Sequence, residues 1–192
     1  MSKINTSTEL EPAISDGTPA DPSVSFVIVT PCWVNGTLRT WADLQGGNDK
    51  PDPGDNLAVS GRGSAVIKVV AKEICIGAIM LKDDTDITLP TEQPKFSLFQ
   101  VGFTLNLGSI DTESDPALCQ FQIGTNGGTI TTMGTSLHVQ RTGDTTTIKV
   151  MQGSIKIVPD KGQESETYGA NRHVAFSVSS SGDPQYVELP WS

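Results

Sequence analysis

The stretch GDTTTIKVMQGSIKIVP (Gly143 to Pro159) alternates apolar and polar residues on both sides of a glycine. Successive side chains of a β-strand point to opposite faces, so this pattern predicts strands with one buried face. A two-residue turn at Gln152 and Gly153 would make the stretch a β-hairpin, and a longer bend at Gly153 is the alternative. The opposed residues would then be Val150 with Ile155, Ile148 with Ile157, and, on the solvent face, Lys149 with Lys156.

The same alternation recurs along most of the chain, which contains 19 glycines and 12 prolines. Such a composition favours many short strands joined by tight turns. Only Thr40 to Gln45 predicts a turn of helix, with Thr40 as its N-cap. We therefore expect an all-β fold, a single antiparallel β-sandwich or jelly-roll-like domain. The predicted strands are 65–71, 73–80, 85–89, 96–107, 118–123, 129–132, 136–141, the two arms of the hairpin, 173–178 and 185–189.

A short sequence repeat accompanies this pattern. FTLNLGSID and IKVMQGSIK place Gly-Ser-Ile at Gly108 and again at Gly153. The repeat indicates either an internal duplication or two similar hairpins with the same residue requirements.

The N-terminal part divides into two segments of different character. Residues 1–23 are rich in Ser, Thr, Pro and acidic residues, which predicts an extended polar arm. The β domain then spans 24–192 and begins with Phe26, Val27, Ile28 and Val29, a run that is apolar on both faces. These four residues are the candidate interaction site, because an extended segment can complete the sheet of a neighbouring molecule by strand addition.

Charge and hydropathy limit the classes of partner that the chain is expected to bind. The formal net charge of −9 disfavours nucleic acid, since no basic stripe offsets it. No run approaches the ~18 apolar residues of a membrane helix, so no membrane insertion is expected. The first residues contain no apolar segment of the signal-peptide type, and the localisation cannot be read from them.

The residues that usually carry catalysis are sparse. The two histidines, His138 and His173, lie in predicted strands, and His138 should face away from Leu137 and Val139. We expect no enzyme activity and no cofactor, with weak Ca²⁺ binding by acidic loops as an open alternative. The acidic loop residues are Asp83, Asp84, Asp86, Asp111, Glu113 and Asp115. The three cysteines, Cys32, Cys75 and Cys119, are expected to be free, packed thiols.

Two segments resemble a known family. TNGGTITTMGTSLHVQRTGDTTTIKVMQGSIKI (Thr125 to Ile157) is similar to the core of FecR-type domains, in which Gly-Thr precedes an alternating strand and V-x-V-x-x-G-x-V-x-V follows. PDPGDNLAVSGRGSAVIKV (Pro51 to Val69) resembles the earlier P-G-D-x-L-x-T-G-x-x-S-x-A motif, with Ser60 in place of Thr. The resemblance covers about residues 50 to 178.

The resemblance implies an extracytoplasmic β domain that passes signals to a sigma factor, and so favours an extracellular or cell-surface location. In that family the β domain follows a membrane helix and a cytoplasmic segment, and this sequence contains neither. Our leading hypothesis is a structural protein that self-assembles through its N-terminal arm into a homo-oligomer or filament. The alternative is a FecR-like module that binds a ligand or a protein. An enzyme on a jelly-roll scaffold is a third, weaker hypothesis.

Overall fold

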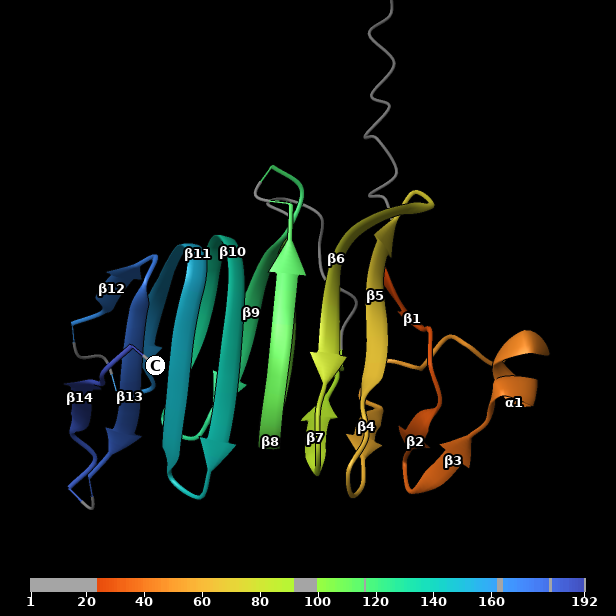
Figure 1. Ribbon diagram of the computed structural model, residues 1–192, viewed down its shortest axis with the longest axis horizontal. Helices are drawn as coiled ribbons and strands as arrows, with labels where there is room; N and C mark the ends of the chain where they lie inside the picture. The colour runs from red at the N-terminus through yellow and green to blue at the C-terminus, as the bar shows by residue number, and fades with distance from the viewer. Residues whose placement is uncertain (1–23, 92–99, 116, 162–163, 180, 192) are drawn as a thin grey trace, which may run out of the picture.

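The fold was analysed in a computed structural model that describes residues 24–91, 100–115, 117–161, 164–179 and 181–191. Within these ranges the regular elements are β-strands, apart from the five-residue helix α1 (Trp41–Gln45) (Figure 1). The prediction of an all-β fold is confirmed. The proposed arm (residues 1–23) and the start of the strand expected at 96–107 lie outside the described residues.

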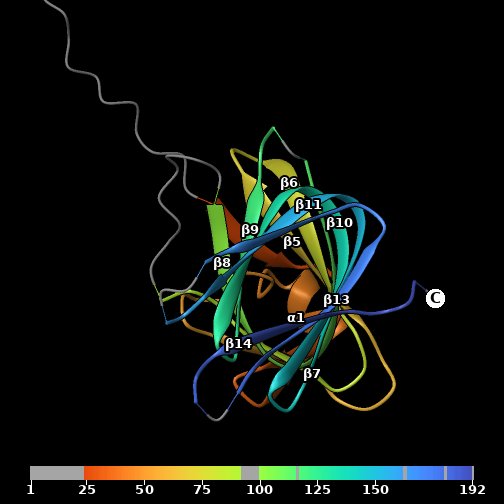
Figure 2. The same cartoon turned by 90° about the vertical axis from the view of Figure 1, so that its left-hand side faces the viewer.

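The strands within the described ranges form one continuous 14-stranded hydrogen-bonded sheet, which folds over into two layers. Three strands of 15 residues each run through both layers: β8 (Gln100–Ser114), β10 (Gly128–Thr142) and β11 (Thr145–Pro159). Viewed along the long axis of the molecule, the strands wrap around an interior (Figure 2). Buried apolar side chains of both layers form one cluster there.

Each half of a long strand has its own neighbours. In layer 1 the order is β1-β5-β6-β8-β10-β11-β13-β14, and in layer 2 it is β3-β2-β4-β7-β8-β9-β10-β11-β12. The other strands of layer 1 are β1 (Val24–Ile28), β5 (Ala65–Ala71), β6 (Ile74–Leu81), β13 (Arg172–Val178) and β14 (Pro184–Glu188). Those of layer 2 are β2 (Cys32–Val34), β3 (Thr37–Arg39), β4 (Asn56–Val59), β7 (Thr85–Thr88), β9 (Gln120–Thr125) and β12 (Glu166–Gly169).

A glycine marks the point where each long strand passes from one layer to the other. Gly108, Gly134 and Gly153 have φ values of +86°, +65° and +76°. At each of them the buried positions change from one set of alternate residues to the other; in β11 they are 146, 148 and 150 before Gly153 and 155, 157 and 159 after it. A bulge of this kind bends a strand and lets it turn a corner between packed layers.

The hairpin predicted at Gln152 and Gly153 is wrong. β11 is one strand, and it pairs along its whole length with β10, from Thr142 opposite Thr145 to Gly128 opposite Pro159. The turn lies instead at Gly143 and Asp144. The alternation in the sequence predicted which side chains are buried, but a corner and a turn both require glycine, and the local pattern does not distinguish them.

The repeated Gly-Ser-Ile is explained by the same corners. Gly108 and Gly153 each open one, and the following Ile110 and Ile155 are the first buried side chains beyond them. Both glycines are also crowded: a methyl group at Gly153 would overlap the carbonyl oxygen of Gly134, and one at Gly108 would lie 2.6 Å from the Cα of Thr85. The repeat thus reflects two equivalent bends rather than two hairpins.

The layers are in direct contact across the core. Gly77 of β6 faces Phe121 of β9, whose ring would lie 2.8 Å from any added Cβ. Phe121 is fully buried and packs edge to face on Phe103, with ring centroids 5.9 Å apart. One apolar cluster therefore joins both layers.

The two ends of the sandwich differ. At one end β12, β13 and β14 are closed by Tyr168, Phe176 and Tyr186, with ring centroids of 5.4 Å for Phe176–Tyr186 and 6.5 Å for Tyr168–Tyr186. At the other end lies α1, which contains no fully buried residue and packs against the core through the half-buried Leu44. Thr40 caps it as predicted, accepting the amide proton of Asp43 while the Asp43 carboxylate accepts from the Thr40 amide at 2.7 Å.

One pairing departs from the predicted antiparallel pattern. β8 and β9 run parallel over Gln100–Thr104 and Gln120–Gly124, and the other pairings among the described residues are antiparallel. A parallel pair needs a crossover connection. β8 begins in layer 2 and, beyond Gly108, ends in layer 1. The chain then returns to layer 2 as β9, which lies beside the first half of β8 and runs in the same direction.

Candidate functional site

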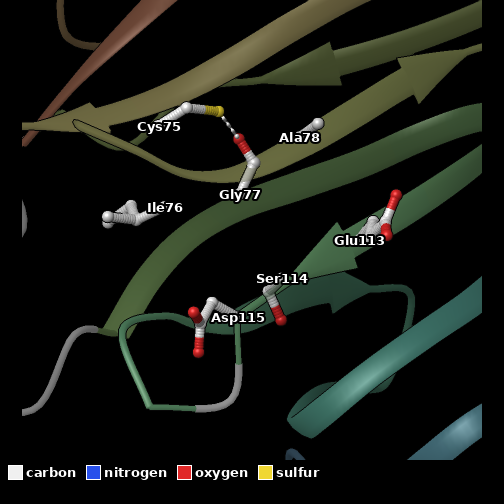
Figure 3. A pocket seen from close by; sticks show the side chains of 7 residues that line it. All are labelled: Cys75, Ile76, Gly77, Ala78, Glu113, Ser114 and Asp115. Carbon is white, nitrogen blue, oxygen red and sulfur yellow. Dashed lines mark hydrogen bonds between the residues drawn. The ribbon is translucent and has the colours of Figure 1, made fainter.

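A hollow opens on layer 1 where β6 pairs with the end of β8. Its volume is about 420 Å³, and Figure 3 shows the side chains around it. Gly77 and Ala78 of β6 lie opposite Ser114 and Glu113 of β8. The lining residues are Cys75, Ile76, Gly77, Ala78, Glu113, Ser114 and Asp115.

A second hollow, of about 270 Å³, lies beside the first on layer 1. The two share Ala78 and Glu113 in their linings, and we call them together the layer-1 groove. The second hollow is lined by Val66, Ala78, Met80, Asp111, Thr112, Glu113, Ser136 and Met151, contributed by β5, β6, β8, β10 and β11.

The bulge at Gly108 determines which residues of β8 reach this groove. Beyond it, Ile110, Thr112 and Ser114 are buried, and the alternate residues Asp111 and Glu113 face outward. Across the strands Glu113 is opposite Ala78 on one side and Ser136 on the other. Two short side chains therefore flank the carboxylate and leave it open to approach.

The walls of the second hollow include two methionines. Met80 is 40% exposed and Met151 is 45% exposed, so both present apolar surface to solvent. Methionine is flexible and polarizable, so it adapts its shape to what it contacts. The groove thus combines an apolar wall with an acidic row.

Asp111 already has two side-chain partners. Its carboxylate lies 2.5 Å from the Lys82 ammonium and 2.7 Å from Nδ1 of His138. Burial alone raises the pKa of Asp111, but the hydrogen bonds from Lys82 and His138 outweigh it and hold the pKa below the ordinary 3.8. His138 faces outward, as its alternation with Leu137 and Val139 predicted.

The other two carboxylates of the row carry no such charge partner. Glu113 is exposed, and no cation of the described residues lies within 4 Å of it. Asp115 accepts the amide proton of Ala117 at 2.9 Å and has no ion pair within the described ranges. The uncompensated negative charge of the groove therefore lies at Glu113 and Asp115.

The cysteines are all free, as predicted. Burial raises the pKa of Cys32 to about 11, an effect that Arg39 partly opposes, and burial together with Cys75 raises that of Cys119 to about 12. Cys75 differs from the expectation of packed thiols. It is exposed at the start of β6, where it lines the first hollow, and its thiol donates to the Gly77 carbonyl at 3.4 Å.

The predicted interaction residues form part of the chain's own sheet. β1 pairs with β5, from Val24 opposite Ala71 to Ile28 opposite Ile67. Phe26 and Ile28 are 7% and 2% exposed and belong to the core, whereas Val27 and Val29 are half-buried. Their role in contacts with another molecule stays a prediction.

Three of the acidic residues considered for Ca²⁺ binding, Asp83, Asp84 and Asp86, have hydrogen-bond partners. Asp83 and Asp84 accept the amide protons of Gly63 and Gly61 at 2.9 and 2.6 Å, and Asp86 accepts from Asn56 and Asn106. Asp83 and Asp84 thus stabilise the Ser60–Ser64 turn, and Asp86 links side chains on the outer face of layer 2. Across the described residues, no three of His, Cys, Asp and Glu come together in a way that could hold a metal ion. Weak Ca²⁺ binding stays a prediction.

Sequence reasoning missed the groove, although one signal was present. In ICIGAIML the alternation places Met80 on the face opposite Ile79 and Leu81, which marks it as an outward-facing apolar residue. The residues around it come from strands far apart in the sequence: Val66 and Met151 are separated by 85 residues, and no local pattern brings them together.

Comparison with known proteins supports the fold. No family model matches the chain, and no curated protein matches it. Two crystal structures of a putative anti-sigma factor from Parabacteroides distasonis, at 2.50 and 1.65 Å resolution, resemble it with a TM-score of 0.51 and 12% identity. The match covers 71% of this chain and 60% of that one, so this chain shares the fold with part of that protein.

No helix in the described part of the chain has the length and apolarity to cross a membrane.

Proposed function

We propose that this chain is a non-catalytic recognition module, comparable to the β domain of FecR-type regulators, which binds another protein through an outer face of its sheet. The observation that carries the proposal is the layer-1 groove, in which exposed methionines adjoin uncompensated carboxylates. The likeness to a protein described as an anti-sigma factor supports it at the level of the fold. An extracytoplasmic location is part of the same proposal.

Site-specific photo-crosslinking in living cells tests this function. A benzophenone amino acid would replace Met151 in the groove and, in a second variant, Val158, which is 39% exposed on layer 2. We expect a cross-link to a distinct protein, which should then bind the purified chain with a Kd below about 10 µM. Cross-links only between copies of this chain, or none at either position, would exclude the recognition module.

Self-assembly by strand addition is the second candidate, favoured by the position of β1 at the edge of layer 1. The Val29 amide bonds to Val66 of β5, so the amides of Val24 and Phe26 point away from β5. The Ile28 amide on that side already donates to Asp49 at 2.7 Å. The free edge is therefore short.

Light scattering decides this second candidate. Val27→Lys places a charge on the edge of β1 and leaves the core side chains unchanged. Assembly through this edge predicts an oligomer for the wild-type chain and a smaller species for the variant. Monomers in both samples would reject it.

A further inference from the structure

We infer that the layer-1 groove binds an extended polypeptide segment that presents an arginine flanked by apolar side chains. This inference rests on the proposed recognition function; it specifies the site of recognition and the chemistry of the protein that binds there.

The acidic row has one neutralised end and one open end. Lys82 and His138 occupy both oxygens of Asp111, at 2.5 and 2.7 Å. Glu113 and Asp115 have no charge partner among the described residues, and Lys68, the cation one strand beyond Ala78, lines neither hollow. A cationic group is therefore the complementary ligand at the Glu113 end of the groove.

Arginine fits this place better than a small cation. Its guanidinium can bind a carboxylate through two parallel hydrogen bonds, and its stem can lie on apolar surface. Ala78 provides a short floor beside Glu113, with Met80 and Met151 as walls. An ion that lacks an apolar stem would leave these methionines uncovered.

The dimensions favour a polypeptide in extended conformation. From Asp111 to Asp115 the outward row advances four residues, which is roughly 13 Å of strand. An extended segment of about four residues has the same length and presents alternate side chains to one face. The two adjacent hollows, of about 420 and 270 Å³, would then receive side chains two residues apart.

Fluorescence anisotropy with defined probes tests the inference. The probe is the labelled, capped peptide Ala-Val-Arg-Val-Arg-Val-Ala, and its counterpart carries Glu in place of Arg. We expect the arginine probe to bind the intact protein and the glutamate probe not to bind. Glu113→Gln and Asp115→Asn should each weaken binding by about 2- to 5-fold, and added salt should weaken it further. Met151→Ala should weaken binding as well, through lost contact.

Two variants make the test specific. Glu166→Gln removes an exposed carboxylate from β12 of layer 2 and should leave the affinity unchanged. Glu113→Lys should abolish binding of the arginine probe and confer binding of the glutamate probe. Because these side chains face solvent, circular dichroism should be the same for all variants.

The outcomes separate the site from the function. Equal affinity of the two probes, affinity that is insensitive to the groove substitutions, or no binding of the arginine probe at about 1 mM overturns the inference. If the cross-linking experiment nevertheless finds a partner through Val158, the recognition function stands and its site lies on layer 2.

Discussion

Single residues decide whether the long strands can bend. Gly153 combines a positive φ with a position against the backbone of Gly134, so no other residue meets both demands. Gly143, in the β10–β11 turn, shares the positive φ (+58°) but has open space around its Cα. Substitution of the two glycines therefore distinguishes the free-energy cost of a positive φ, which both share, from the cost of steric overlap, which only Gly153 has.

Gly153→Ala should lower the free energy of unfolding by about 3 kcal/mol or more, because strain and overlap add. Gly143→Ala, the control, should cost only about 1 kcal/mol, the conformational part. Urea unfolding followed by circular dichroism measures both. Equal losses in the two variants would show that the corner tolerates a side chain.

Asp111 gives the molecule a pH dependence. Its pKa is lowered in the folded state, so its contribution to stability is present above the ordinary carboxyl value of 3.8 and is lost as the pH falls through the folded-state value. Asp111→Asn should therefore reduce the free energy of unfolding at pH 7, and the difference from wild type should vanish once the pH lies below the folded-state pKa of Asp111. A difference that persists in acid, where the carboxyl is protonated in both states, would show that Asp111 acts through packing rather than charge.

Among the elements, the edge strands β12 and β14 close one end of the sandwich through their aromatic residues. The Tyr186 ring packs on Phe176 and Tyr168, but its hydroxyl is buried with no hydrogen-bond partner among the described residues. A buried, unpaired hydroxyl costs free energy. The ring thus stabilises this end, and its oxygen opposes that effect.

Tyr186→Phe should leave the free energy of unfolding unchanged or raise it by up to about 1 kcal/mol, because it removes only the unpaired hydroxyl. Tyr186→Ala should lower it by about 2 to 4 kcal/mol through loss of the ring. Thermal and urea unfolding of the two variants provide the measurement. A clear loss in Tyr186→Phe would indicate that the hydroxyl is hydrogen-bonded in solution.

The sequence predicted local features of the elements, such as burial and capping, better than the contacts between residues far apart in the chain. Burial of Ile148, Val150, Ile155 and Ile157 followed from alternation, and the cap at Thr40 followed from its side chain. The role of Gly153 did not, because the carbonyl that crowds it belongs to Gly134, 19 residues away. The groove was missed for the same reason, since it exists only once five strands are in register.

For the whole molecule, the three shared strands bind the layers into one cooperative unit. β8, β10 and β11 each supply core residues to both layers, and Gly77 and Phe121 join the layers directly. Neither layer can lose its strands without disrupting the other. We therefore expect a single unfolding transition.

Ile79→Ala tests this cooperativity. Ile79 is fully buried in layer 1, and its truncation should cost about 2 to 5 kcal/mol. In a Cys75→Ser, Cys119→Ser background the remaining thiol, Cys32, lies buried in layer 2. The urea midpoint for Cys32 labelling should fall together with the midpoint from circular dichroism. An unchanged labelling midpoint would mean that the layers unfold separately.

The placement of the indole rings has a practical consequence for such measurements. Trp33, Trp41 and Trp191, the three tryptophans of the chain, are 37%, 57% and 48% exposed. Their emission should already resemble that of hydrated indole in the native protein and should shift little when the chain is denatured. Fluorescence will therefore report events at the periphery, and a spectroscopist who relied on it alone would mistake a melted core for an intact one.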